Sequence, residues 1–80
     1  MVQPEQIKQW IEAGLDGARV TVVGDGHHFE AVIVSPAFDD KSMVQQHQLV
    51  YQVLGEKMKE EIHALSMRTL TPEQAARQGE

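Results

Sequence analysis

The sequence predicts an α+β fold with the element order α-β-β-α-β(-α), in which a three-stranded mixed sheet carries helices packed on one face. Three observations support this fold class. The turn Gly24-Asp25-Gly26 separates two β-branched segments, a long segment after Ser42 has helical spacing, and a third β-like segment follows at 64–70. A hairpin followed by a crossover helix and a returning strand produces a mixed sheet.

The length bounds the organisation of the chain. Its 80 residues form one domain, 1–80, because this size leaves no room for a second core. The start lacks the features of a signal peptide, and no apolar run approaches the roughly 20 residues that span a bilayer. We therefore expect a cytoplasmic protein without a membrane partner. There is no cysteine, so any metal chemistry must use His, Asp, Glu or a partner's thiols.

Charge and motifs argue against two broad function classes. The chain has 7 basic and 12 acidic residues and a net charge of −5, and its basic residues are scattered, so we do not expect strong nucleic-acid binding. Ser35 and Ser42 lie in neither a nucleophile elbow nor a phosphate-binding loop. The sequence therefore predicts no enzymatic activity.

The first half of the chain contains the predicted hairpin. Pro4 and Glu5 are typical of a helix start, and apolar residues at helical spacing predict a helix over 4–14. The segments 18–23 and 29–35 predict two strands joined by the glycine turn. The connection to the next helix is irregular, with one short helical turn expected.

The second half begins with a predicted long helix. Ser42 and Gln45 form a capping-box pattern, and we expect one helix over 42–59. Its expected apolar face consists of Met43, Val44, His47, Val50, Tyr51, Leu54 and Met58. After the strand at 64–70, Thr71, Pro72 and Gln74 predict another helix start. We expect the tail, from about 75 to 80, to fray.

Four histidines are the candidates for metal chemistry. His47 lies on or beside the apolar face of the long helix, which favours a structural role, and His27 follows the turn, where a solvated residue is the simpler interpretation. His28 and His63 lie at the predicted end of the sheet, and neither position needs histidine for packing. Two histidines so far apart in sequence are a weak signal, and they cannot complete a metal site without further ligands.

Three separated motifs resemble the BolA family, most nearly its short bacterial, IbaG/YrbA-like branch. They are GDGHHFEAVIVSPAF, KSMVQQHQLVYQVLGEKM and IHALSMRTLTPEQ, which together run from about residue 20 to residue 74. The resemblance implies a class II KH-like fold, in agreement with the element order above. It also implies a non-enzymatic role.

The resemblance further implies a partner and a cofactor. BolA-like proteins pair with monothiol glutaredoxins and share a bridging [2Fe-2S] cluster, in iron–sulfur cluster trafficking or in iron and stress regulation. The family's ligand in the IHAL motif corresponds to His63. The second ligand falls in the loop between the first two strands, where the resemblance favours His28, with His27 as the substitute. The partner's cysteine and a glutathione thiol would supply the remaining ligands, so the isolated protein is expected to hold no cofactor.

Two departures from the family pattern bear on an alternative function, that of a KH-like nucleic-acid-binding transcriptional regulator. The family's RHR sequence is Gln46-His47-Gln48 here, and its FxGKS turn has Asp40 in place of glycine. A nucleic-acid-binding KH domain also needs a GxxG loop, which this chain lacks. In that alternative, Lys41 and His47 would contact the nucleic acid. A third possibility is a homodimer formed through the same face, without a cluster.

Overall fold

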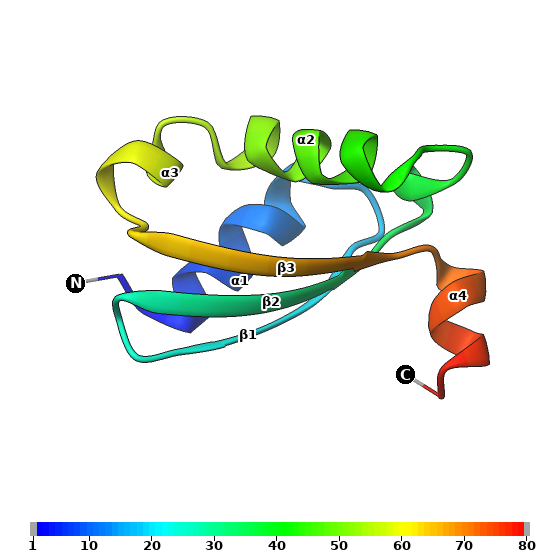
Figure 1. Ribbon diagram of the computed structural model, residues 1–80, viewed down its shortest axis with the longest axis horizontal. Helices are drawn as coiled ribbons and strands as arrows, with labels where there is room; N and C mark the ends of the chain where they lie inside the picture. The colour runs from blue at the N-terminus through cyan, green and yellow to red at the C-terminus, as the bar shows by residue number, and fades with distance from the viewer. Residues whose placement is uncertain (1, 80) are drawn as a thin grey trace.

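The computed structural model describes residues 2–79, which fold into a sheet with helices against it (Figure 1). The order of elements confirms the predicted α-β-β-α-β-α pattern, with one 3₁₀ turn in the expected connection. The elements are α1 (Pro4–Gly14), β1 (Arg19–Gly24), β2 (His28–Val34), η1 (Pro36–Phe38), α2 (Met43–Leu54), α3 (Lys57–Glu60), β3 (Ala64–Leu70) and α4 (Pro72–Arg77).

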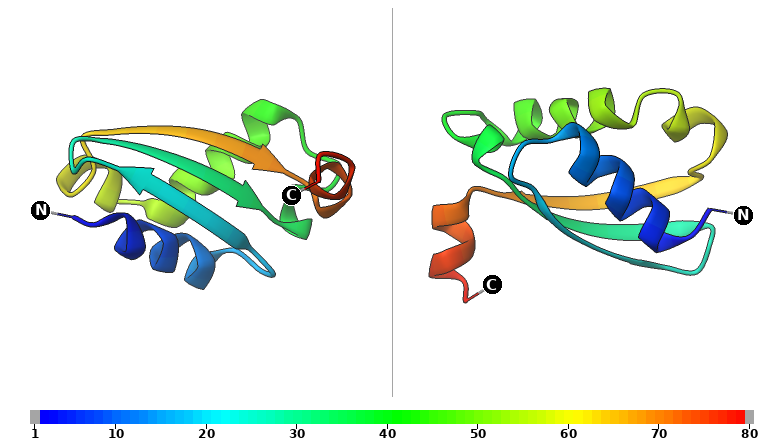
Figure 2. Two further views of the ribbon diagram at one scale, coloured as in Figure 1. Left: turned by 90° about the horizontal axis from the view of Figure 1, so that it is seen from below. Right: turned by 180° about the vertical axis from the view of Figure 1, so that it is seen from behind.

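The described residues form a three-stranded mixed sheet with the strand order β1-β2-β3, as predicted. Strands β1 and β2 are antiparallel, with Arg19 opposite Val34, and β2 and β3 are parallel, with His28 opposite Ala64. The arrows in Figure 2 show these directions. Because β2 and β3 run the same way, the residues that begin these two strands meet at one end of the sheet.

Helices α1 and α2 cover one face of the sheet and enclose the core with it (Figure 2). Alternation along β2 directs Phe29, Ala31 and Ile33 toward these helices. The largest side chains that are fully buried in this core are Phe29, Phe38, Ile7, Ile11, Ile33, Leu54 and Val50.

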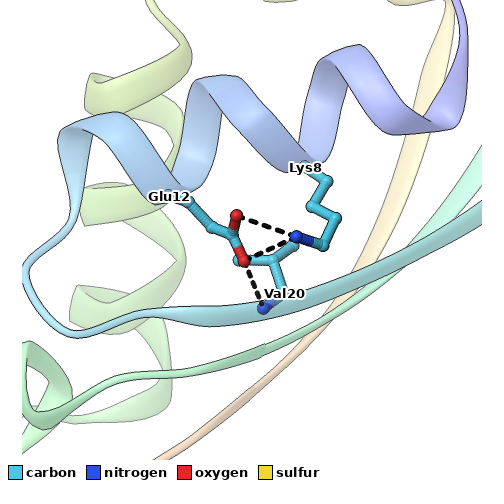
Figure 3. A network of polar contacts seen from close by, with 3 residues as sticks. All are labelled: Lys8, Glu12 and Val20. Atoms are coloured by element: carbon cyan, nitrogen blue, oxygen red, sulfur yellow. Dashed lines mark hydrogen bonds and ion pairs between the residues drawn. The ribbon is translucent and has the colours of Figure 1, made fainter.

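A charged network fixes α1 against β1 (Figure 3). The Lys8 Nζ donates to both carboxylate oxygens of Glu12, at 2.8 and 2.9 Å, and Glu12 also accepts the backbone N–H of Val20 at 3.3 Å. The hydrogen bond with Lys8 lowers the pKa of Glu12, and the same bond raises the pKa of Lys8. The helix is therefore joined to the sheet at its polar edge as well as through the core.

The prediction of one helix over 42–59 was wrong, although the Ser42–Gln45 capping box at its start is confirmed. Helix α2 ends at Leu54, and the short helix α3 follows separately. Gly55 causes the break because its φ of 54° lies in the left-handed region, which glycine adopts without steric cost. Among residues 2–79, no helix combines the length and the apolar character needed to cross a membrane.

The predicted apolar face of this helix was also partly wrong. The buried residues of α2 are Gln46, Val50 and Leu54, at four-residue intervals, whereas Met43 and Val44 are 69% and 66% exposed. Sequence reasoning placed His47 on the buried side of the helix, whereas its neighbour Gln46 is the buried residue. The error arose because the prediction followed the apolar residues and did not expect a buried glutamine.

Helix α4 packs at one end of the opposite face of the sheet. Val34 and Leu70 point to that face because they alternate with the inward Ile33 and Thr69, and Ala75 packs against both. The Thr71–Gln74 capping box is confirmed. The helix continues to Arg77 with Ala75 fully buried, beyond the point where we expected the frayed tail to begin.

Candidate metal-ligand site

The loop between β1 and β2 is organised by one aspartate. The Asp25 carboxylate accepts the backbone N–H groups of His27 and His28, both at 2.9 Å, and the Asp25 N–H donates to the His28 carbonyl at 3.3 Å. The hydrogen bonds from the His28 and His27 backbone lower the pKa of Asp25. This local pattern holds the two histidines in a defined backbone conformation at the end of the hairpin.

Glycine is required where the loop leaves β1. A Cβ atom on Gly24 would lie 2.5 Å from the Phe29 ring and 2.6 Å from the His28 carbonyl oxygen. Phe29 is fully buried in the core. The close approach therefore places the end of β1 directly against a residue of the core.

The parallel register decides which loop histidine lies beside His63. His28 pairs with Ala64, and the Ala64 N–H donates to the His27 carbonyl at 3.2 Å. Side chains alternate between the faces of a sheet, so the residues that precede this pair, His27 and His63, lie together on the other side.

The structure places the rings of His27 and His63 side by side. Their centroids are 5.6 Å apart, and the ring planes are tilted by 39°. Both side chains are exposed, whereas Ile62 next to His63 is buried in the core and anchors that segment. The rings open onto a hollow of about 280 Å³ lined by Val2, Gly26, His27, Glu60, Glu61 and His63.

His28 points away from this hollow. It begins β2 and is exposed on the outer face, where its Nε2 lies 3.1 Å from the Ser66 Oγ. Of the two loop histidines, the structure therefore brings His27, the substitute, next to His63, and it turns the preferred His28 to the opposite face. The reason is that His28 alternates with the inward Phe29 along β2, so its side chain points to the outer face.

The pair forms only part of a metal site. Within residues 2–79, no group of three or more His, Cys, Asp or Glu side chains is arranged to hold a metal ion. Two neighbouring imidazoles are nonetheless a common donor set for zinc, copper and iron. His27 and His63 therefore supply only two of the four ligands of a tetrahedral metal site.

The comparison with known families agrees with the sequence resemblance. A family model described as BolA-like protein matches residues 12–74, most of the chain. The chain belongs to the BolA family.

Similar proteins differ in how much of their own length this chain covers. The chain is 35% identical to the acid stress protein IbaG of Escherichia coli over 95% of its own length and 92% of that protein. It is also 44% identical to the DNA-binding transcriptional regulator BolA of Haemophilus influenzae, over 71% of this chain but only 55% of that regulator. A solved BolA homologue from Coxiella burnetii superposes with a TM-score of 0.91 at 50% identity, covering 96% of this chain and 100% of that one.

The BolA-family turn that departs from the FxGKS pattern has an unusual backbone. Asp40, which replaces the glycine of that pattern, has a φ of 63°. Aspartate tolerates this left-handed conformation better than most residues but still less well than glycine. The substitution noted in the sequence therefore falls at a position where glycine fits best.

The two residues predicted for nucleic-acid contact, Lys41 and His47, lie far along the sheet from the histidine pair. They line a groove of about 400 Å³ between α2, the end of β3 and α4, and Arg68 lines it as well. Sequence reasoning missed Gln46 in this region. Its side chain donates to the Phe38 and Lys41 carbonyls at 3.3 and 3.0 Å and accepts the Thr69 hydroxyl at 2.7 Å.

Proposed function

We propose that this BolA-family protein is an adaptor that pairs with a monothiol glutaredoxin and co-ligates a bridging [2Fe-2S] cluster, in iron–sulfur cluster trafficking or iron and stress regulation. His63 and His27 are the proposed ligands from this chain. The observation that carries the proposal is the adjacency of these two exposed rings, 5.6 Å apart, at one end of the sheet.

The chemistry of the pair fits one side of such a cluster. Two imidazoles replace two thiolates on one iron in Rieske centres, where they raise the reduction potential. The glutaredoxin cysteine and a glutathione thiol would supply the sulfur ligands, which a chain without cysteine cannot provide. Glu60 and Glu61 line the same hollow, and carboxylates are common acceptors for the second ring N–H of a metal-bound histidine.

The proposal revises the choice between the loop histidines. The family resemblance favours His28, whereas the position of the rings favours His27, because His28 faces Ser66 on the outer side of the sheet. For His28 to bind a metal together with His63, the loop would have to rearrange. The hydrogen bonds from the His27 and His28 N–H groups to Asp25 oppose that rearrangement.

Reconstitution tests the partner, the cofactor and the ligands together. The protein is mixed with a monothiol glutaredoxin, glutathione, iron and sulfide, and the visible circular dichroism is compared with that of the glutaredoxin alone. We expect a different spectrum for the mixture and a heterodimer on size exclusion. The His63→Ala variant should return the spectrum to that of glutaredoxin alone, and an unchanged mixed spectrum would reject His63 as a ligand. Size exclusion of the protein alone also tests the homodimer.

A nucleic-acid-binding regulator is the second candidate, and the similarity to the DNA-binding transcriptional regulator BolA of Haemophilus influenzae favours it. Lys41 and His47 share one groove, as that function would require. The net charge of −5 opposes it. Binding through phosphates would show a steep salt dependence. The lack of measurable affinity for DNA and RNA at low salt would dismiss this candidate.

A further inference from the structure

A hollow lined by basic side chains lies at the opposite end of the sheet from the histidine pair. This groove, of about 400 Å³, is formed where the end of β3 meets α2 and α4. Its volume is within the roughly 300–1,000 Å³ typical of sites for small molecules. The cluster proposal makes no use of it.

The charge of the groove is opposite to that of the chain. Lys41, His47 and Arg68 line it, and none of the described residues that line it is acidic, although the chain has 12 acidic and 7 basic residues. The imidazole of His47 can donate a hydrogen bond in either neutral tautomer. The groove therefore presents donors and positive charge in an otherwise acidic protein.

Hydrogen bonds of the buried Gln46 side chain fix the backbone that carries two of these donors. The Gln46 side chain donates to the Lys41 carbonyl at 3.0 Å and accepts a hydrogen bond from the Thr69 hydroxyl at 2.7 Å. These two bonds link the Lys41 backbone to α2 and, through Gln46, to β3. His47 follows Gln46 directly on the helix. The lysine and the histidine consequently sit on a connected framework rather than on a free loop.

The remaining walls suggest the shape of a ligand. Met43, Met67 and Leu70 provide apolar surface, and Gln74 of α4 and Gln78, which follows that helix, line the groove as well. A molecule with one anionic group and a small, partly apolar body would contact all of these walls. Phosphate is the anion best suited to several donors converging from different elements.

We propose that this groove binds a small phosphorylated molecule of about the size of a nucleoside monophosphate. One compact group formed by Lys41, Arg68 and the His47 imidazole fits a single phosphate group. A nucleic-acid strand needs a positive surface that continues along its backbone, and the scattered basic residues do not supply one. The site lies at the other end of the sheet from His27 and His63, so it is independent of the cluster proposal.

Amide NMR of the full chain can test the site with defined probes. The protein is titrated at low salt with inorganic pyrophosphate, with adenosine 5′-monophosphate and, separately, with a ten-nucleotide single-stranded DNA. We expect the two small probes to shift the amide signals of Lys41, His47 and Leu70 while leaving those of His27 and His63 in place. Weaker binding of pyrophosphate than of the nucleotide would show that the apolar wall contributes.

Charge-matched variants decide whether the groove itself binds. The double variant Lys41→Gln with His47→Gln should weaken binding of the nucleotide by about tenfold or more, since it removes charge-assisted hydrogen bonds. Lys59→Gln removes one positive charge from α3, outside the groove, and should change the Kd by less than about twofold. The proposal is overturned if neither small probe shifts these signals, or if Lys59→Gln weakens binding as much. Tighter binding of the DNA through the same residues would also overturn it and would favour the regulator function.

Discussion

The two ends of the sheet use their polar residues in opposite ways. At the end with His27 and His63, the Asp25 carboxylate accepts the backbone N–H groups of the loop. Both imidazoles are exposed to solvent. At the other end, the buried Gln46 side chain is fully engaged with Thr69 and two carbonyls. The contrast indicates that side-chain hydrogen bonds stabilise the fold at one end, whereas the histidine side chains at the other end are exposed to solvent.

Of the changes that test this comparison, Gln46→Ala is expected to have the largest effect on stability. The change leaves the Thr69 hydroxyl and two carbonyls without their partner, which should lower the free energy of unfolding by about 1–3 kcal/mol. Chemical denaturation measures this. Gln48→Ala, at an exposed position of the same helix, is the matched control and should change stability by less than about 0.5 kcal/mol. Equal stability of the two variants would contradict a structural role for this end.

A smaller effect of the opposite sign is expected from Asp40→Gly. Glycine relieves the left-handed backbone at φ 63° but adds freedom to the unfolded chain, so we expect a net gain of about 0.5 kcal/mol. Thermal unfolding measures the shift. Asp39→Gly is the control because Asp39 has a φ of −57°, where glycine relieves nothing, and it should leave stability unchanged or lower. A destabilised Asp40→Gly variant would show that the aspartate side chain makes a contribution of its own.

At the histidine end, Asp25→Ala should have a local effect. It removes the acceptor for the His27 and His28 N–H groups, so amide hydrogen exchange at these two residues should speed up while the core stays protected. Asp25→Asn keeps an acceptor oxygen and should preserve more of the protection. Equal exchange in the alanine variant and the natural protein would mean that the loop does not depend on Asp25.

The pH dependence of this loop follows from the lowered pKa of Asp25. A carboxyl whose pKa is lower in the folded state stabilises the fold at a pH above its unfolded pKa, and this contribution is lost as the pH falls through the folded value. The amide shifts of His27 and His28 should therefore titrate together below the usual range for aspartate. A midpoint at or above that range would contradict the ionic hydrogen bonds.

Much of the fold could be predicted because local signals and spacing agreed. The strands on either side of the glycine turn, the capping boxes at Ser42 and Thr71, and the final strand were all visible in the sequence. The break at Gly55 was missed because apolar spacing continued across it. The buried side of α2 was displaced because Gln46 looks like a surface residue until its partners, which are distant in sequence, are known.

The site could be predicted only in part, for a geometric reason. Sequence placed His63 and a loop histidine at the same end of the sheet, but which loop histidine lies beside His63 depends on the register between β2 and β3. That register, in which His28 pairs with Ala64, is a contact between segments far apart in sequence. A shift of one residue would exchange the roles of His27 and His28.

The most direct test of the central claim compares His27→Ala with His28→Ala in the complex reconstituted with a monothiol glutaredoxin, glutathione, iron and sulfide. The two variants remove the same side chain from adjacent, exposed positions, so differences in folding are minimal. Visible circular dichroism of the cluster is the measurement. We predict that His27→Ala abolishes the spectrum of the mixed complex while His28→Ala retains it. Loss of the spectrum in His28→Ala alone would contradict the ligand pair proposed from the structure.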